Sequence, residues 1–258
     1  TAKALVAKDK GKKGMHKLSA CEVRYNSKSF VELIARTQAA HGITTLVPKD
    51  FKTTSIWMTS FLIFMNDFDG GEYVTSSHAV STKLATKDLN PEGSQYLPEE
   101  TMEFVHKIQH ILDQAEKDQF VLTLAPLNDS HIDFTFFEKM KFGIPLYADY
   151  LKKGVASPGN IKNIRDIKNK IIIECVGGCM YNMMSRLFEA FAIGKSFDYI
   201  RKEENSFFHG VGKTNINPKT KEKEYFDYSC DTTLLDVAAT LHYEHLLKDK
   251  PVGTSILL

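Results

Sequence analysis

Two short fragments end in the residue types that bind phosphate in nucleotide-hydrolysing enzymes. They are Gly212-Lys213-Thr214 and Gly194-Lys195-Ser196. A phosphate-binding loop of that kind needs another glycine five residues before its second one, because its backbone amides wrap the phosphates. Phe207 and Glu189 occupy those positions, which argues against nucleotide hydrolysis. The fragments are either coincidental or small basic turns that suit any phosphate, including that of an RNA backbone.

Other candidate sites lack an essential member. His106 and His110 have the spacing of a zinc protease, but Lys107 stands where the glutamate base is needed. Cys175 and Cys179 have a spacing found in zinc sites, yet no second ligand pair follows them. We therefore expect no metal, no cofactor, no catalytic residue and no enzymatic activity.

A set of charged and polar residues in apolar surroundings is a stronger candidate for a functional site. Arg186 lies between apolar residues of an expected helix, Asn182 lies one turn earlier, and Asp227 lies among aromatic residues. An arginine near a core must pair with a carboxylate or a bound anion, because an unpaired buried charge is strongly destabilising. Two interpretations stay open: a structural Arg186–Asp227 bridge, or a phosphate site in which Asp227 orients the guanidinium.

The apolar periodicity predicts helices and few strands. Helices are expected at 29–41, 55–66, 98–117, 129–142, 144–153, 160–170, 178–192 and 195–204, and from about 231. Residues 68–97 are rich in turn-forming residues and are expected to form a long loop or a small hairpin. Few segments alternate with a period of two, so the predicted fold class is mainly α, a helical core with extended ends.

Composition and charge suggest three regions. With 43% hydrophobic residues the chain can bury a core, and its longest apolar stretch is too short to cross a bilayer. Residues 1–28 hold eight basic residues against two acidic ones, which suits a polyanion partner, self-association or a disordered tail. The expected organisation is a basic N-terminal arm (1–28), a core (29–247) and an extended C-terminal tail (248–258).

The order of charged residues in the C-terminal half resembles that of filamentous plant virus coat proteins. The set is Asn182, Arg186, Arg201, Asp227 and Asp236, in helical or aromatic surroundings. Together with Ser157 in "VASPGN", it is most similar to the coat proteins of closteroviruses and criniviruses. The resemblance covers about residues 157–247.

The resemblance implies a capsid protein with a helical core and two extended arms. Such a protein polymerises into a flexible helical filament by exchanging arms with neighbouring subunits, and encloses single-stranded RNA in a sequence-tolerant groove. It implies RNA binding by Ser157, Asn182, Arg186, Arg201, Lys213 and Asp227. It also implies a structural salt bridge among Arg186, Asp227 and Asp236.

The same resemblance implies a location in the virion, with the host cell cytoplasm as the place of assembly. Partners would include a minor coat protein and other virion-end proteins, and no membrane. Two alternatives stay open: a monomeric RNA-binding regulatory protein, and a phosphotransferase with a dispersed active site.

Overall fold

The computed structural model describes residues 14–117, 122–154, 158–210, 212–216, 219–228 and 244–257. Residues 210, 212–216 and 223–228 are described by their backbone alone. The chain forms two compact units, each assembled from several segments. The first unit takes its described residues from 1–21, 27–74 and 86–142, and the second takes 22–26, 75–85 and those after 142.

The first unit is an α/β unit built on a five-stranded mixed sheet with the order β4-β3-β1-β2-β5. Its elements are β1 (His16–Cys21), α2 (Ser27–Ala39), β2 (Thr44–Leu46), the 3-10 turn η1 (Lys49–Phe51), α3 (Ile56–Met65), β3 (Gly71–Val74), β4 (Thr86–Leu89), α4 (Pro98–Lys117), β5 (Ile132–Asp133), α5 (Phe136–Lys139) and the 3-10 turn η2 (Lys141–Gly143). The β1–β2, β1–β3 and β2–β5 pairs are parallel, and β4 runs antiparallel to β3.

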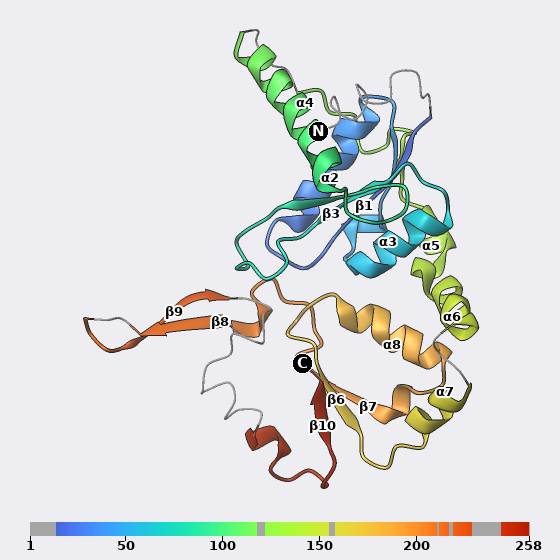
Figure 1. The fold of residues 1–258 in the computed structure, drawn as a ribbon, viewed down its shortest axis with the longest axis vertical. Coiled ribbons are helices and arrows are strands. Elements are labelled where there is room, and N and C mark those ends of the chain that lie inside the picture. Colours follow the sequence, from blue (N-terminus) through green and yellow to red (C-terminus); the bar gives the residue numbers. More distant parts are fainter. Residues whose placement is uncertain are drawn as a thin grey trace. The chain divides into compact units, whose positions relative to one another are not determined.

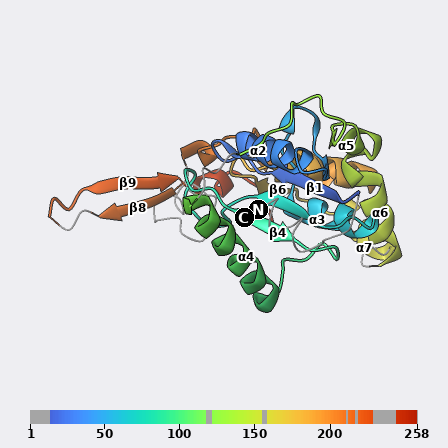
Figure 2. The ribbon, with the colours of Figure 1, turned by 90° about the horizontal axis from the view of Figure 1, so that it is seen from above.

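Strand β1 lies at the centre of this sheet and is covered on both faces. Its residues 17–21 are all buried, although their side chains alternate between the two faces. Helices α2 and α3 both pack on β1, as Figure 1 and Figure 2 show. A Cβ on Gly71, in the neighbouring strand β3, would collide with the backbone carbonyl oxygen of Leu18 in β1. Glycine at position 71 therefore allows β3 to pair with β1 at Leu18 without a side-chain clash.

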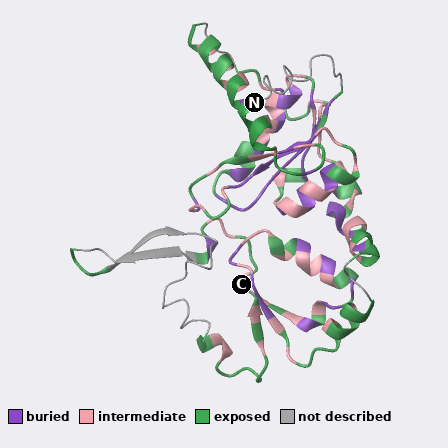
Figure 3. Ribbon diagram, in the orientation of Figure 1, coloured by how far each residue is buried: buried purple, intermediate pink, exposed green. Residues whose placement is uncertain are grey.

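Helix α4 begins where its local signals predict. Pro98 is its first residue, and Glu99 and Glu100 lie in the first turn, where acidic side chains interact favourably with the helix dipole. Among its residues only Phe104 is buried, and this ring packs edge-on against Tyr96 with their centroids 4.8 Å apart. Most of α4 is exposed in Figure 3.

The second unit holds a three-stranded parallel sheet with the order β10-β6-β7 and a separate hairpin, β8–β9. Its elements are α6 (Ile144–Lys153), α7 (Pro158–Arg165), β6 (Ile171–Glu174), α8 (Met180–Ala190), the 3-10 turn η3 (Gly194–Ser196), β7 (Phe197–Ile200), the 3-10 turn η4 (Phe208–Gly210), β8 (Gly212–Ile216), β9 (Lys223–Tyr228) and β10 (Ser255–Leu257). Residues 244–247 form one further helical turn.

The core of the second unit lies between α6 and α8. Ala148 of α6 packs with Leu187 of α8 and with Phe191 and Ile193 just beyond it. The stacked rings of Phe188 and Phe197, with centroids 4.3 Å apart, join this cluster to β7. The amphipathic pattern of 178–192 therefore correctly predicted a helix that buries one face.

Several expectations from the sequence are wrong. The fold class is α/β and not mainly α, because each unit contains a sheet with parallel strands. Residues 197–200 form β7, where a helix over 195–204 was expected. Arm exchange through the C-terminal tail is also corrected, since Ser255–Leu257 pairs with β6 of the same chain. Along the described residues, no helix has both the length and the apolar character of a bilayer-spanning segment.

Candidate functional site

Two polar segments begin where neighbouring parallel strands end. Cys21, the last residue of β1, is the register partner of Val74, the last residue of β3. Residues 22–26 follow β1 directly, and residues 75–85 connect β3 to β4. Loops at the carboxyl ends of parallel strands are where α/β folds commonly bind ligands. We call residues 75–80 the Ser77 loop.

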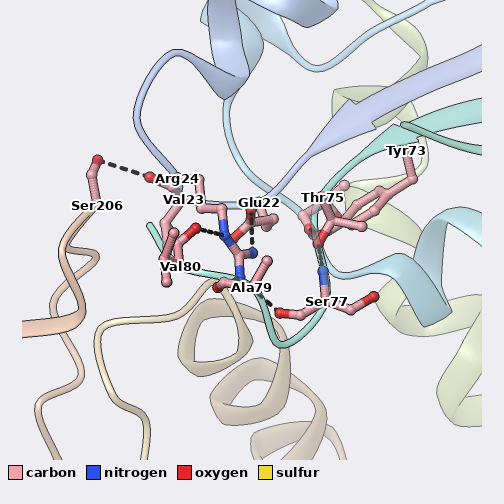
Figure 4. Close-up of polar contacts among 10 residues, drawn as sticks. Glu22, Val23, Arg24, Tyr73, Thr75, Ser77, Ala79, Val80 and Ser206 are labelled. Carbon is pink, nitrogen blue, oxygen red and sulfur yellow. Dashed lines mark hydrogen bonds and ion pairs between the residues drawn. The ribbon is translucent and has the colours of Figure 1, made fainter. Parts of the chain in front are cut away.

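The Arg24 side chain organises the Ser77 loop (Figure 4). Its Nη2 donates to the carbonyl oxygens of Ser77 and Ala79, both at 2.7 Å, and its Nε donates to that of Val80 at 3.3 Å. Its Nη1 donates to Glu22 Oε1 at 2.8 Å. Arg24 is only 3% exposed, so these hydrogen bonds form away from water and hold the loop firmly.

Glu22 binds the Arg24 guanidinium, and its carboxylate is itself buried, which disfavours its charged form. Burial raises the pKa of the Glu22 carboxyl above its ordinary value, and the neighbouring Arg24 opposes this rise without cancelling it. A fork-shaped guanidinium can serve a carboxylate and several carbonyls together, whereas a lysine ammonium is a point charge. The pair therefore connects the segment after β1 to the segment after β3.

Ser77 has an unusual backbone conformation. Its φ is +53°, in the left-handed region that non-glycine residues seldom adopt. Its amide donates to Thr75 Oγ1 at 3.2 Å, and both Ser77 and its neighbour His78 are exposed. Strain held by surrounding contacts is common where a side chain must be presented for chemistry. The loop thus presents a hydroxyl and an imidazole to solvent while its carbonyls bind Arg24.

A further segment, residues 205–208, contacts Val23 and Arg24. Ser206 Oγ donates to the Val23 carbonyl at 2.8 Å, and the guanidinium of Arg24 lies 5.3 Å from the centroid of the Phe208 ring. Phe208 is 1% exposed and packs with Val23 and Val176. The residues on both sides of Arg24 are therefore held by packing as well as by hydrogen bonds.

The structure gives protein partners to two of the residues that the sequence suggested as RNA ligands, Asn182 and Arg201. Asn182, on α8, is exposed and donates to Glu204 Oε1 at 3.1 Å. Arg186 is half-buried on the same helix. Arg201 follows β7 and forms a bidentate pair with Glu174. Its Nε donates to Glu174 Oε1 at 3.1 Å and its Nη2 donates to Glu174 Oε2 at 2.7 Å. The Glu174 side chain is fully buried.

The remaining predicted ligands are described in part or not at all. Lys213 and Asp227 are register partners in the β8–β9 hairpin, where the backbone alone is described. Ser157 and Asp236 lie outside the described residues. The Arg186–Asp227–Asp236 bridge therefore stays a prediction.

The two glycine-lysine fragments do not form phosphate-binding loops. Gly194–Ser196 is the 3-10 turn η3 after α8, and residues 212–214 lie within strand β8. Neither fragment joins the end of a strand to the start of a helix, the arrangement that a phosphate-wrapping loop needs.

A cavity of about 210 Å³ lies within the first unit, between α2, β3 and β4. It is lined by Leu33, Ile34, Thr37, Gln38, Glu72, Thr86, Asp88 and Leu122. Asp88 Oδ1 is buried there without a hydrogen-bond partner among the described residues. Burial, followed by the nearby Glu72 charge, raises the pKa of the Asp88 carboxyl. The described residues contain no cluster of three or more His, Cys, Asp or Glu side chains able to hold a metal ion.

Asp88→Asn is expected to stabilise the protein near pH 7 by about 1 kcal/mol, because it removes a poorly solvated charge. A raised pKa means that the folded state binds a proton more readily, so Asp88 destabilises the fold increasingly as pH rises above the ordinary value of 3.8. The gain should vanish below that value. Urea unfolding at pH 7 and below pH 3.8 measures the gain in stability. The control is Asp166→Asn, because Asp166 is exposed. An equal effect of the two substitutions at pH 7 would contradict the destabilising role given to the Asp88 charge.

The Ser77 loop has a signal in the sequence, although it matches no known catalytic motif. Residues 75–78 read Thr-Ser-Ser-His directly after the apolar end of β3, a run of hydroxyl and imidazole side chains at a strand end. Glu22 and Arg24 likewise follow β1. These signals depend on knowing where the strands end, and β1 was not predicted.

Comparison with known proteins adds information on the fold. No protein-family profile matches this sequence, and no curated protein matches it. Among solved structures, the chain is similar to the open form of pp63/parafusin, an exocytosis-sensitive phosphoprotein and phosphoglucomutase from Paramecium. The TM-score is 0.64 at 15% identity, covering 98% of this chain and 45% of the other. It is also similar to a protein named as a candidate phosphomannomutase from Thermus thermophilus, with a TM-score of 0.54 at 17% identity, covering 84% and 44%.

The similarity overturns the resemblance to viral coat proteins. The fold is that of proteins named as phosphoglucomutase and phosphomannomutase, and the chain spans less than half the length of these two structures. The expectations of a closterovirus-like capsid protein, a filament, an RNA groove, minor coat protein partners and a place in the virion or the infected cytoplasm are wrong on this finding. The expectation that the chain is no enzyme is wrong on the same finding.

Proposed function

We propose that this chain functions in phosphoryl transfer on phosphorylated hexoses, and that Ser77 is the residue that carries the phosphoryl group. The observation that supports this most directly is the presentation of Ser77. Its exposed hydroxyl lies on a left-handed turn whose carbonyls accept hydrogen bonds from the buried Arg24. The names of the two structural neighbours supply the substrate class, hexose phosphates.

The chemistry needs one nucleophilic oxygen and a firm position for it. In the first step, the bond between Ser77 Oγ and phosphorus forms while the bond between phosphorus and a sugar oxygen breaks. The serine proton passes to the departing sugar oxygen. The reverse step onto a different hydroxyl regenerates Ser77 and yields an isomeric sugar phosphate. Phosphoryl transfer depends mainly on such positioning and on charge stabilisation.

Ser77→Ala is expected to reduce covalent phosphate incorporation by about two orders of magnitude or more, because the accepting oxygen is lost. The chain is incubated with glucose 1-phosphate or mannose 1-phosphate carrying labelled phosphate, in a magnesium buffer, and the label is located by peptide mass spectrometry. Ser76→Ala is the matched control, since Ser76 is the adjacent hydroxyl and should not affect labelling. Absence of label from wild-type protein, or equal loss in both variants, would overturn the proposal.

A further inference from the structure

Two aromatic rings lie exposed beside the residues that hold the Ser77 loop. Tyr25 is 57% exposed and Phe207 is 43% exposed. Their rings are nearly parallel, at 25°, with centroids 6.4 Å apart. The two rings therefore lie close to each other, and both residues are largely open to solvent.

The neighbours of both rings are anchored. Tyr25 follows Arg24, whose guanidinium donates to the Ser77 carbonyl at 2.7 Å. Phe207 precedes the buried Phe208, and its amide donates to Asn205 Oδ1 at 2.9 Å. Side chains on such anchored backbone lose little freedom when a ligand binds, which favours recognition.

We propose that Tyr25 and Phe207 form a platform on which the pyranose ring of a phosphorylated hexose stacks when its phosphate reaches Ser77. This inference rests on the proposed function and names the two side chains that select its substrate. The axial C–H groups of a pyranose make an apolar face, and an aromatic ring presents a negative face to them. Arg24, which precedes Tyr25 in the chain, reaches the carbonyl oxygen of Ser77 with its side chain.

Another exposed pair in the second unit provides a comparison. Tyr147 and Tyr150 are also stacked, at 22° with centroids 6.2 Å apart, and Tyr150 is 55% exposed. They lie on α6, a different element from the Ser77 loop and from residues 205–208. Tyr150→Leu is therefore a matched control for the loss of an exposed stacked ring.

The experiment measures the affinity of the full chain for three compounds by calorimetry: glucose 6-phosphate, glycerol 3-phosphate and adenosine monophosphate. We expect Tyr25→Leu and Phe207→Leu each to weaken glucose 6-phosphate binding by about 3- to 10-fold. Affinity for glycerol 3-phosphate, which has a phosphate but no ring, should stay unchanged. Tyr25→Phe and Phe207→Tyr should retain binding, and Tyr150→Leu should bind as wild type does.

The outcomes separate the platform from the proposed function. If Ser77 is labelled by hexose phosphates but Tyr25→Leu and Phe207→Leu bind glucose 6-phosphate normally, the platform is wrong and the phosphotransferase proposal stands. If wild-type protein neither binds hexose phosphates nor becomes labelled, both are wrong. Equal weakening of glycerol 3-phosphate binding would show a general structural effect and overturn the platform. Tighter platform-dependent binding of adenosine monophosphate would overturn the hexose assignment.

Discussion

Arg24→Ala is expected to lower the free energy of unfolding by about 3–5 kcal/mol, the range for removing one partner of a buried ion pair. The substitution leaves the Glu22 carboxylate buried without its cation. It also leaves the carbonyls of Ser77, Ala79 and Val80 without the donor that they now share. Urea unfolding measures the loss, and hydrogen exchange of residues 75–85 should show it locally.

A second arginine in the same unit provides the control. Arg165 donates to the carbonyls of Ala192 and Phe191 at 3.3 and 3.2 Å, but it is exposed. Arg165→Ala should therefore cost only about 1 kcal/mol, because water replaces the lost donor. Adding Glu22→Gln to Arg24→Ala should recover part of the loss by removing the stranded charge. An Arg24→Ala protein that unfolds at the same urea concentration as Arg165→Ala would contradict the role given to Arg24.

Helices with strong local signals could be predicted from the sequence. The predicted bounds of 98–117 agree with α4, and Pro98 and the acidic first turn mark its start. The 55–66 prediction agrees closely with α3, Ile56–Met65. The hairpin alternative for 68–97 is confirmed by the antiparallel β3–β4 pair. In each case the information lies within one short stretch of chain.

Parallel strands left no such local signal. A strand buried on both faces shows a short apolar run and not an alternation, so a period of two does not reveal β6, whose sequence is Ile-Ile-Ile-Glu. Strand β1 was harder to detect, because Lys17 and Ser19 interrupt its apolar residues. Both polar side chains hydrogen-bond Glu72, more than fifty residues away in sequence. Their burial depends on a partner that no local pattern reveals.

The site shows the same limitation. Arg24 binds carbonyls of Ser77 and Ala79, and backbone carbonyls have no sequence signature. Its partners are 53 and 55 residues distant. The sequence instead drew attention to Arg186, whose apolar neighbours can be read along one helix. An arginine between apolar residues is recognisable from sequence, whereas an arginine that holds a distant loop requires the fold.

Lys17→Met is expected to lower the free energy of unfolding by about 3–5 kcal/mol, because it leaves a buried carboxylate without its cation. Lys17 Nζ lies 2.8 Å from Glu72 Oε1, and the two side chains are 1% and 3% exposed. Asp88, the register partner of Glu72 on β4, adds a second negative charge nearby. The loss should be measured by urea unfolding at neutral pH.

The pair's net contribution should be far smaller than that loss, because burying two charges is itself costly. Lys17→Met combined with Glu72→Gln should therefore regain most of the stability, since the glutamine oxygen still accepts the hydrogen bond that Ser19 now gives to Glu72 at 2.8 Å. Lys153→Met removes the exposed partner of Asp149 and should change stability by less than about 0.5 kcal/mol. If the double substitution is no more stable than Lys17→Met alone, the cost comes from lost packing of the lysine stem and not from the charge left on Glu72.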